Sequence, residues 1–160
     1  MDWIIEKTEK TSFHTDLSVI TKPFFNYIDD YNWAIFDLEF ISGAVSELPI
    51  NHTEKYFVLS PSDFKKIFHK ETPHSFVQLV WGVILAIPIA EKVKFDENNL
   101  PSADGNSEAW NPGNFQHPKA QIEIVCFDST CTIVKFKNED LSNSFKTYFN
   151  TETIRLKGLS

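Results

Sequence analysis

The spacing of apolar residues changes along the chain from helix-like to strand-like. Between Leu17 and Ile28, apolar residues recur every three or four positions, which is typical of a helix. Pro23 lies inside this run. Because a proline in a helix interior removes a backbone hydrogen bond, we expect a helix that starts near Pro23 or one that is kinked.

Two later segments carry clearer helix signals. Ser60 precedes Pro61, which suits the first turn of a helix, so we predict a helix over 61–70 with Ser60 as its cap. Asn138-Glu139-Asp140 starts another, running to about Phe149. The expected inward positions are Phe64, Ile67 and Phe68 in the first helix, and Leu141, Phe145 and Tyr148 or Phe149 in the second.

Runs rich in aromatic and β-branched residues predict five strands, at 33–41, 55–59, 76–87, 121–127 and 130–137, with a short one at 153–156 to finish the domain. The run 76–87 suits a central strand covered on both faces. Simple alternation in 33–41 places Phe36, Leu38 and Phe40 on one face, and Ile35, Asp37, Glu39 and Ile41 on the other.

The two cysteines flank a predicted tight turn. If Asp128-Ser129 is a two-residue hairpin loop, Cys126 lies directly opposite Cys131, close enough for a disulfide. A cytosolic location would keep both thiols reduced. We therefore expect small packing residues, with a disulfide, a redox pair or a metal site as alternatives.

These elements predict an α+β fold in a single domain of residues 1–160, built on a mainly antiparallel sheet of about five strands with about three helices packed on it. Residues 93–120 lose the periodicity and form a long irregular loop. Loops of this length are usually functional or disordered. This one carries Trp110 and Phe115, which a disordered spacer rarely keeps.

Charge narrows the class of partner. The chain has 22 acidic against 15 basic residues and a single arginine, Arg155, which argues against general nucleic-acid binding. Ten of the acids but only four lysines fall in residues 1–60. No leader or bilayer-length apolar run occurs, so we expect a cytoplasmic protein that does not enter membranes.

No catalytic pattern stands out. The five histidines are dispersed, the five glycines form no phosphate loop, and Asp128-Ser129 lacks a nucleophile elbow, so we expect no catalytic, cofactor or metal site. Asp37 and Glu39 could act as an acid and a base in a pocket, or could face water. Beside Tyr31 and Trp33 they would also suit a surface that receives a basic protein.

Three segments together resemble small bacterial immunity proteins, the cytosolic antidotes to toxins from neighbouring cells: Tyr31-Asn32-Trp33-x-Ile35, then Trp81-Gly82-Val83-Ile84-Leu85-Ala86-Ile87-Pro88, then the hairpin Val125-Cys126-Phe127-Asp128-Ser129-Thr130 with a short helix after it. The resemblance lies in layout and aromatic positions. It implies a binding protein without an active site.

The sequence thus favours a protein-binding antidote that blocks the active surface of a cognate toxin, most simply a basic toxin domain. The alternative is an enzyme or small-ligand binder with a pocket under the 93–120 loop. Trp110 could be a hot spot for a partner or could cover the core. The residues predicted to bind the partner are Asp29, Asp30, Tyr31, Asp37, Glu39, Trp110 and Phe115.

Overall fold

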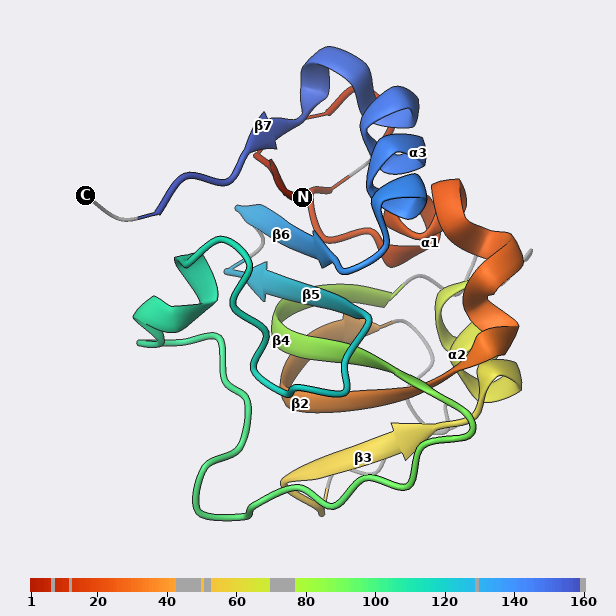
Figure 1. Ribbon diagram of the computed structural model, residues 1–160, viewed down its shortest axis with the longest axis vertical. Helices are drawn as coiled ribbons and strands as arrows, with labels where there is room; N and C mark the ends of the chain where they lie inside the picture. Colours follow the sequence, from red (N-terminus) through yellow and green to blue (C-terminus); the bar gives the residue numbers. More distant parts are fainter. Residues whose placement is uncertain are drawn as a thin grey trace.

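The computed structural model describes residues 1–6, 8–11, 13–42, 50, 53–69, 77–128 and 130–158. Within these residues, seven strands form one sheet in the order β3-β2-β4-β5-β6-β1-β7, and every neighbouring pair is antiparallel (Figure 1). The strands are β1 (Asp2–Ile5), β2 (Tyr31–Ser42), β3 (Tyr56–Leu59), β4 (Val77–Pro88), β5 (Ile122–Phe127), β6 (Cys131–Phe136) and β7 (Ile154–Arg155).

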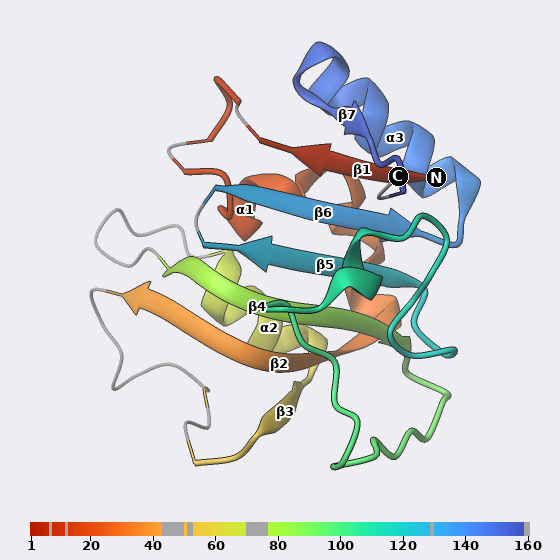
Figure 2. The ribbon, with the colours of Figure 1, turned by 90° about the vertical axis from the view of Figure 1, so that its left-hand side faces the viewer.

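Helices cover one face of the sheet, and the chain between β4 and β5 covers the other (Figure 2). The helical segments are α1 (Leu17–Ile20), η1 (Lys22–Asp30), α2 (Pro61–Phe68) and α3 (Glu139–Phe149), with short 3-10 turns η3 (Ser107–Trp110) and η4 (Asn150–Glu152). The predicted α+β class with an antiparallel sheet is therefore confirmed.

Side-chain caps begin α2 and α3: Ser60 was predicted as a cap, whereas Asn138 was predicted only as part of the start of its helix. Ser60 Oγ accepts a hydrogen bond from the Asp63 amide at 3.1 Å, and Asn138 Oδ1 accepts from the Leu141 amide at 3.1 Å. Both bonds satisfy backbone donors that the first turn of a helix leaves unpaired. The prediction of a kinked helix near Pro23 is also confirmed, since η1 follows α1 through Thr21 and is itself kinked at Phe24, whose φ of −127° is not helical.

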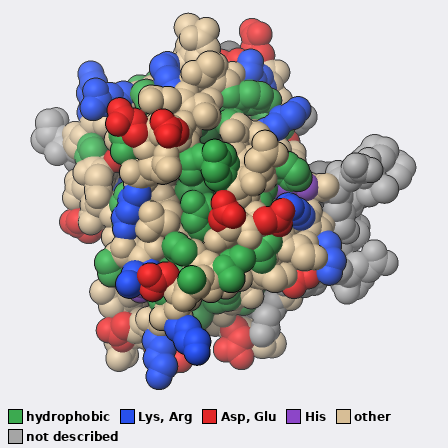
Figure 3. Space-filling view, turned by 45° about the vertical axis from the view of Figure 1, so that its right-hand side comes forward, with side chains coloured by type: hydrophobic (Ala, Val, Ile, Leu, Met, Phe, Trp, Pro, Cys, Tyr) green, Lys and Arg blue, Asp and Glu red, His purple; other side chains and the backbone are tan. Residues whose placement is uncertain are grey.

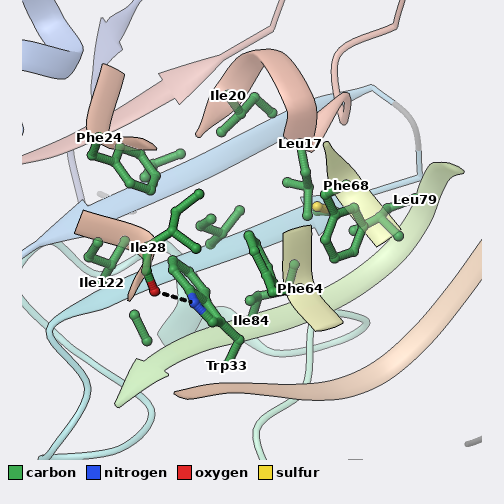
Figure 4. Close-up of a cluster of buried hydrophobic side chains, with 14 of the residues drawn as sticks. Leu17, Ile20, Phe24, Ile28, Trp33, Phe64, Phe68, Leu79, Ile84 and Ile122 are labelled. Carbon is green, nitrogen blue, oxygen red and sulfur yellow. Dashed lines mark hydrogen bonds between the residues drawn. The ribbon is translucent and has the colours of Figure 1, made fainter. Parts of the chain in front are cut away.

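The helix-side core is built on aromatic stacking. Trp33 of β2 stacks on Phe64 of α2, with ring centroids 4.1 Å apart, and its indole N–H donates to the Ile28 carbonyl at 3.2 Å (Figure 4). All three residues are buried, as predicted for Phe64. Burying a tryptophan this completely is favourable because its one polar atom is hydrogen-bonded.

A second core lies on the opposite face. Successive residues of β4 alternate between the two cores: Ile84 faces the helices, whereas Val83 and Leu85 face the chain between β4 and β5. β4 is thus covered on both faces, as predicted. We call residues 89–121 the covering segment.

The predicted count of five strands was wrong, because the sheet has seven. The missed strand is β1, which pairs with β6 on one side and with β7 on the other. Its four residues are too few for a periodic pattern. The short strand expected at 153–156 corresponds to β7, which is only two residues long.

A bulge in β2 makes the predicted face assignment wrong. Phe36 packs in the core under the covering segment, whereas Leu38 and Phe40 pack against the helix-side core. The pairing with β4 is irregular between Phe36 and Glu39, and Asp37 there has a φ of 50°. The bulge reverses the alternation beyond Phe36, which simple period-two reasoning cannot anticipate.

The predicted register of the β5–β6 hairpin was also wrong. Phe127 pairs with Cys131 and Cys126 pairs with Thr132, so the loop is one residue longer than predicted. Ser129, half of the predicted turn, lies outside the described residues. The shift places Cys126 in the helix-side core and Cys131 in the opposite core, and both are free thiols. Side chains on opposite faces of a sheet cannot form a disulfide.

Mild oxidation of the native protein is therefore expected to give no internal disulfide. Cys126 should also resist alkylation, because burial raises its pKa to about 12 and the thiolate is the reactive form. Mass spectrometry after alkylation under native conditions and in denaturant, where both thiols should react, checks this. An internal disulfide, or rapid native labelling of Cys126, would contradict the register.

Candidate functional site

The covering segment is held to the sheet by aromatic contacts along its length. The Phe95 ring lies 4.8 Å from that of Phe36 and 5.2 Å from that of Tyr56. Farther along, the Trp110 ring lies 4.8 Å from that of Phe127, and Ala109 beside it is fully buried. The segment predicted as an irregular loop at 93–120 thus forms one wall of a core and contains the turn η3.

Beneath it lies a row of buried charges that the sequence did not reveal. Asp2, Lys135 and Glu123 are neighbours across β1, β6 and β5, and all three are almost inaccessible to solvent. Lys135 Nζ lies 3.1 Å from Glu123 Oε1. We call these three residues the buried ion row. An ion pair in such a place needs further hydrogen bonds to offset its desolvation.

Those hydrogen bonds come from the backbone of the covering segment. The Gly113 amide donates to Asp2 Oδ2 at 2.5 Å, Lys135 Nζ donates to the Asn114 carbonyl at 2.6 Å, and the Gln116 amide donates to Glu123 Oε2 at 2.7 Å. Burial raises the pKa of Glu123, while the charge of Lys135 acts in the opposite direction. The row therefore anchors the covering segment rather than facing a cavity.

A hollow of about 300 Å³ remains where η3 approaches the ends of β4 and β5. Its walls include Trp81, Trp110 and Phe127, and the Trp81 and Phe127 rings meet almost edge to face with centroids 5.8 Å apart. We call this hollow the aromatic cleft. Its lining residues are Trp81, Ala103, Gly105, Asn106, Ser107, Trp110 and Phe127.

The four tryptophans differ in whether their indole N–H donates a hydrogen bond to a described residue: two do and two do not. Trp3 Nε1 donates to Ser142 Oγ at 2.8 Å, and Trp33 Nε1 donates to a backbone carbonyl. Trp81 and Trp110 are partly exposed, and no acceptor for their N–H groups occurs in the described part of the chain. Two large apolar surfaces with unused donors thus face one hollow, a combination typical of binding sites.

Polar side chains fix the shape of the cleft. Asp37 Oδ2 accepts from the Ala103 amide at 3.2 Å, so the bulge in β2 attaches one end of the cleft wall to the sheet. Asn106 caps η3 by accepting from the Glu108 amide at 3.0 Å, and its Nδ2 donates to Gln116 Oε1 at 2.9 Å. The wall that carries Trp110 is therefore braced from both sides.

Exposed carboxylates lie next to the cleft. Asp104 adjoins Ala103 and Gly105, Asp128 follows Phe127, and Glu39 pairs across the sheet with Trp81. We call Asp37, Glu39, Asp104 and Asp128 the acidic rim. None of the four forms a salt bridge with any described residue. Their charge is available to a cation in solution.

The predicted partner-binding residues fall into separate groups. Trp110 lines the cleft, while Asp37 accepts from the amide of the lining residue Ala103 and Glu39 pairs across the sheet with the lining residue Trp81. Phe115 is on the same side of the sheet but lies elsewhere in the covering segment, with Lys137 Nζ 5.2 Å from its ring centroid. Trp81, which belongs to the site, was missed because it lies within an apolar run typical of a buried strand.

Asp29, Asp30 and Tyr31 lie apart from the cleft, where η1 meets β2. Asp29 Oδ2 accepts from Lys65 Nζ of α2 at 2.6 Å, so much of its charge is already compensated. Partial burial raises the pKa of Tyr31, with a smaller contribution from Asp30. The structure does not bring these three residues together with Trp110.

The helix side has its own apolar surface, and hydrophobic side chains gather in the middle of the face drawn in Figure 3. Phe25 is 40% exposed and Tyr27 46% exposed on η1. The Phe25 ring already contacts His69, with centroids 4.8 Å apart, and has Lys65 Nζ 5.2 Å from its centroid. Phe25 therefore offers an exposed aromatic side chain on the opposite side of the sheet from Trp110.

A polar hollow of about 350 Å³ adjoins the cleft inside the covering segment. The side-chain amides of Asn106, Asn114 and Gln116 contribute to its lining, and these groups bond mainly to one another or to Glu108. Gln116 Nε2 is buried without a partner in the described residues. This hollow is the feature closest to the alternative of a ligand pocket under the loop.

The histidines of the described residues belong to no cluster that could hold a metal ion. His52 and His74 lie outside the described residues, and elsewhere no three metal-ligating side chains come together. His69 Nε2 lies 2.7 Å from Thr21 Oγ1, whose hydroxyl hydrogen is directed to the Leu17 carbonyl at 2.6 Å. The ring therefore donates its Nε2 proton to Thr21. Burial and then the charge of Lys65 lower the pKa of His69 to about 4.

His69 should make the protein less stable in weak acid. Its folded pKa lies below the unfolded value of about 6.5, so the unfolded chain takes up the proton first and stability falls as the pH drops from 6.5 towards 4. Allowing for partial exposure, we expect a loss of about 1 kcal/mol between pH 7 and pH 5. Urea unfolding of the wild type and of His69→Gln checks this; equal pH dependence in both would contradict it.

No family model matches the chain, and no curated protein or solved structure matches it at a significant level. Among the described helices, none has the length and apolar character needed to cross a membrane.

Proposed function

We propose that the chain is a protein-binding antidote that blocks the active surface of a basic toxin domain, and that the aromatic cleft with its acidic rim is the binding surface. The observation that carries the proposal is the pair Trp81 and Trp110. Both indoles line one hollow, and no described residue accepts a hydrogen bond from either indole N–H. The neighbouring carboxylates form no salt bridge with the described residues.

The chemistry of the cleft suits a protein partner. Tryptophan is enriched among the residues that dominate binding energy, because a buried indole combines a large apolar area with one hydrogen-bond donor. Carboxylates around such a centre add little affinity individually, but they attract a basic partner and accelerate association. The formal net charge of −7 acts in the same direction. The toxin assignment rests additionally on the resemblance to immunity proteins.

A small-ligand binder is the second candidate. The two hollows, of about 300 and 350 Å³, are at the lower limit of ordinary ligand pockets. Their linings differ, one aromatic and the other rich in amides. A ligand that uses both would raise the melting temperature of the protein without any protein partner.

The experiment uses the chain as bait in an extract of the source cell, at low and high salt, beside two variants. The cleft variant is Asp104→Asn with Asp128→Asn, and the control is Asp29→Asn with Asp30→Asn, which removes the same charge from the other side of the sheet. We expect the wild type and the control to retain one basic protein at low salt, with less recovered at high salt. Toxin activity of that protein must then be inhibited by the chain.

Loss of the protein with the control but not with the cleft variant would move the binding surface to the helix side. A recovered protein whose activity is unchanged by the chain would contradict the antidote role. Recovery of no protein, together with a small molecule that raises the melting temperature, would favour the second candidate.

A further inference from the structure

The aromatic cleft has the dimensions of a pocket for a single side chain. Its volume of about 300 Å³ is too small for a folded segment of a partner, yet it is bounded by two indoles and a phenyl ring. Phe127 is only 8% exposed and forms the floor, while Trp81 and Trp110 retain accessible surface. An occupant would therefore touch mainly aromatic faces and edges.

The ring arrangement presents aromatic faces in different directions. Trp110 is inclined at 35° to Phe127, whereas Trp81 is inclined at 73° to the same ring. Two indoles set at different angles around a common phenyl ring can contact an inserted group on more than one side. The face of an indole carries partial negative charge and attracts cations, more strongly than the face of any other side chain.

The surroundings also favour a cation. No lysine or arginine occurs among the described lining residues, although lysines lie over Tyr148, Phe25, Phe115 and Trp3 elsewhere in the molecule. The carboxylates of the acidic rim belong to neighbours of the lining residues, since Asp104 and Asp128 each follow a lining residue in the chain and Glu39 pairs with Trp81. Ser107 supplies a hydroxyl in the wall. Among the described residues, lysine ammonium groups thus lie over several aromatic rings but over none of the rings that line the cleft.

We propose that the cleft receives one arginine side chain of the protein partner, stacked against Trp110 and Trp81, with its guanidinium directed to the acidic rim. The inference rests on the proposed function and names the group that the partner inserts. Arginine fits better than lysine because its guanidinium is planar, is more weakly hydrated and can bind a carboxylate with two parallel hydrogen bonds.

The test follows the four indole N–H signals of the protein by NMR during titration with acetyl-Gly-Arg-Gly-amide at millimolar concentration. The Trp81 and Trp110 signals, assigned with Trp81→Phe and Trp110→Phe, should shift, whereas those of Trp3 and Trp33 should not. The matched control peptide carries citrulline, which has the shape of arginine without its charge. We expect it to bind roughly 5- to 30-fold more weakly, the range of a cation–π contact.

Equal binding of the arginine and citrulline peptides would overturn the inference, as would tighter binding of the corresponding lysine peptide. So would an arginine peptide that leaves both cleft indoles unmoved. Suppose that one of these peptide results is obtained, but that the cleft variant Asp104→Asn with Asp128→Asn fails to retain the protein partner in the bait experiment. Then only the arginine assignment fails. If binding of the partner does not depend on the cleft either, the proposed binding surface fails as well.

Discussion

Replacing Lys135 by methionine is expected to lower the free energy of unfolding by about 3–5 kcal/mol. The ammonium group bridges Glu123 and the Asn114 carbonyl in a fully buried position, and Asp2 is its neighbour across the strands. Methionine keeps the apolar stem but leaves the buried carboxylate of Glu123 without its cation, whereas Asp2 Oδ1 still has the N-terminal ammonium at 3.6 Å. Because native stability is commonly about 5–15 kcal/mol, this loss is a large part of the total.

Urea unfolding measures the effect, with Lys137→Met as the control. Lys137 is on the same side of the sheet but is exposed, and its Nζ donates to the Pro118 carbonyl. Its replacement should cost less than about 1 kcal/mol. If Lys135→Met does not fold, Glu123→Gln keeps an acceptor for the Gln116 amide and should still cost about 1–3 kcal/mol. A cost below 1 kcal/mol for both variants would contradict the anchoring role of the buried ion row.

Replacing Trp110 by alanine is expected to weaken binding of the purified partner at least 30-fold, which corresponds to about 2 kcal/mol. Trp110 supplies one wall of the aromatic cleft and packs against Phe127, so truncation removes both the contact area and the shape of the pocket. Isothermal titration calorimetry with wild type and variant gives the ratio of dissociation constants directly.

Phe25→Ala is the matched control, because Phe25 is a large exposed aromatic residue on the helix side. Its replacement should change the affinity less than about threefold, since residues outside an interface contribute little to binding. A far-ultraviolet circular dichroism spectrum shows whether each variant is folded. A larger effect of Phe25→Ala than of Trp110→Ala would place the partner on the helix side of the sheet and would contradict the cleft as the binding surface.

The sequence sufficed to predict the elements whose signals are local. A few neighbouring residues are enough to predict the Ser60 cap, the start of α3 at 138–140, the inward stripe of α2 and the doubly covered strand β4. The bulge at Asp37 and the longer β5–β6 loop have no comparable signal, because each is decided by pairing with a distant strand. One residue of shift in either place moves side chains to the other face.

The site was only partly predictable for the same reason. Trp110 stands out because it is a large aromatic residue in a polar loop, and the carboxylates of β2 stand out by their alternation. Trp81 gives no signal, since a tryptophan in an apolar strand is usually core. Lys135 and Glu123 resemble the outward charges of half-exposed strands, and only the path of the covering segment shows that they are buried.

Hydrogen–deuterium exchange of the chain, free and in complex with its partner, tests the central claim most directly. We expect slower exchange on binding in residues 103–110 and at Phe127 and Asp128, which line or adjoin the aromatic cleft, and unchanged exchange in η1 and α2. Slower exchange confined to η1, α2 and the start of β2, with residues 103–110 unaffected, would contradict the cleft as the binding surface.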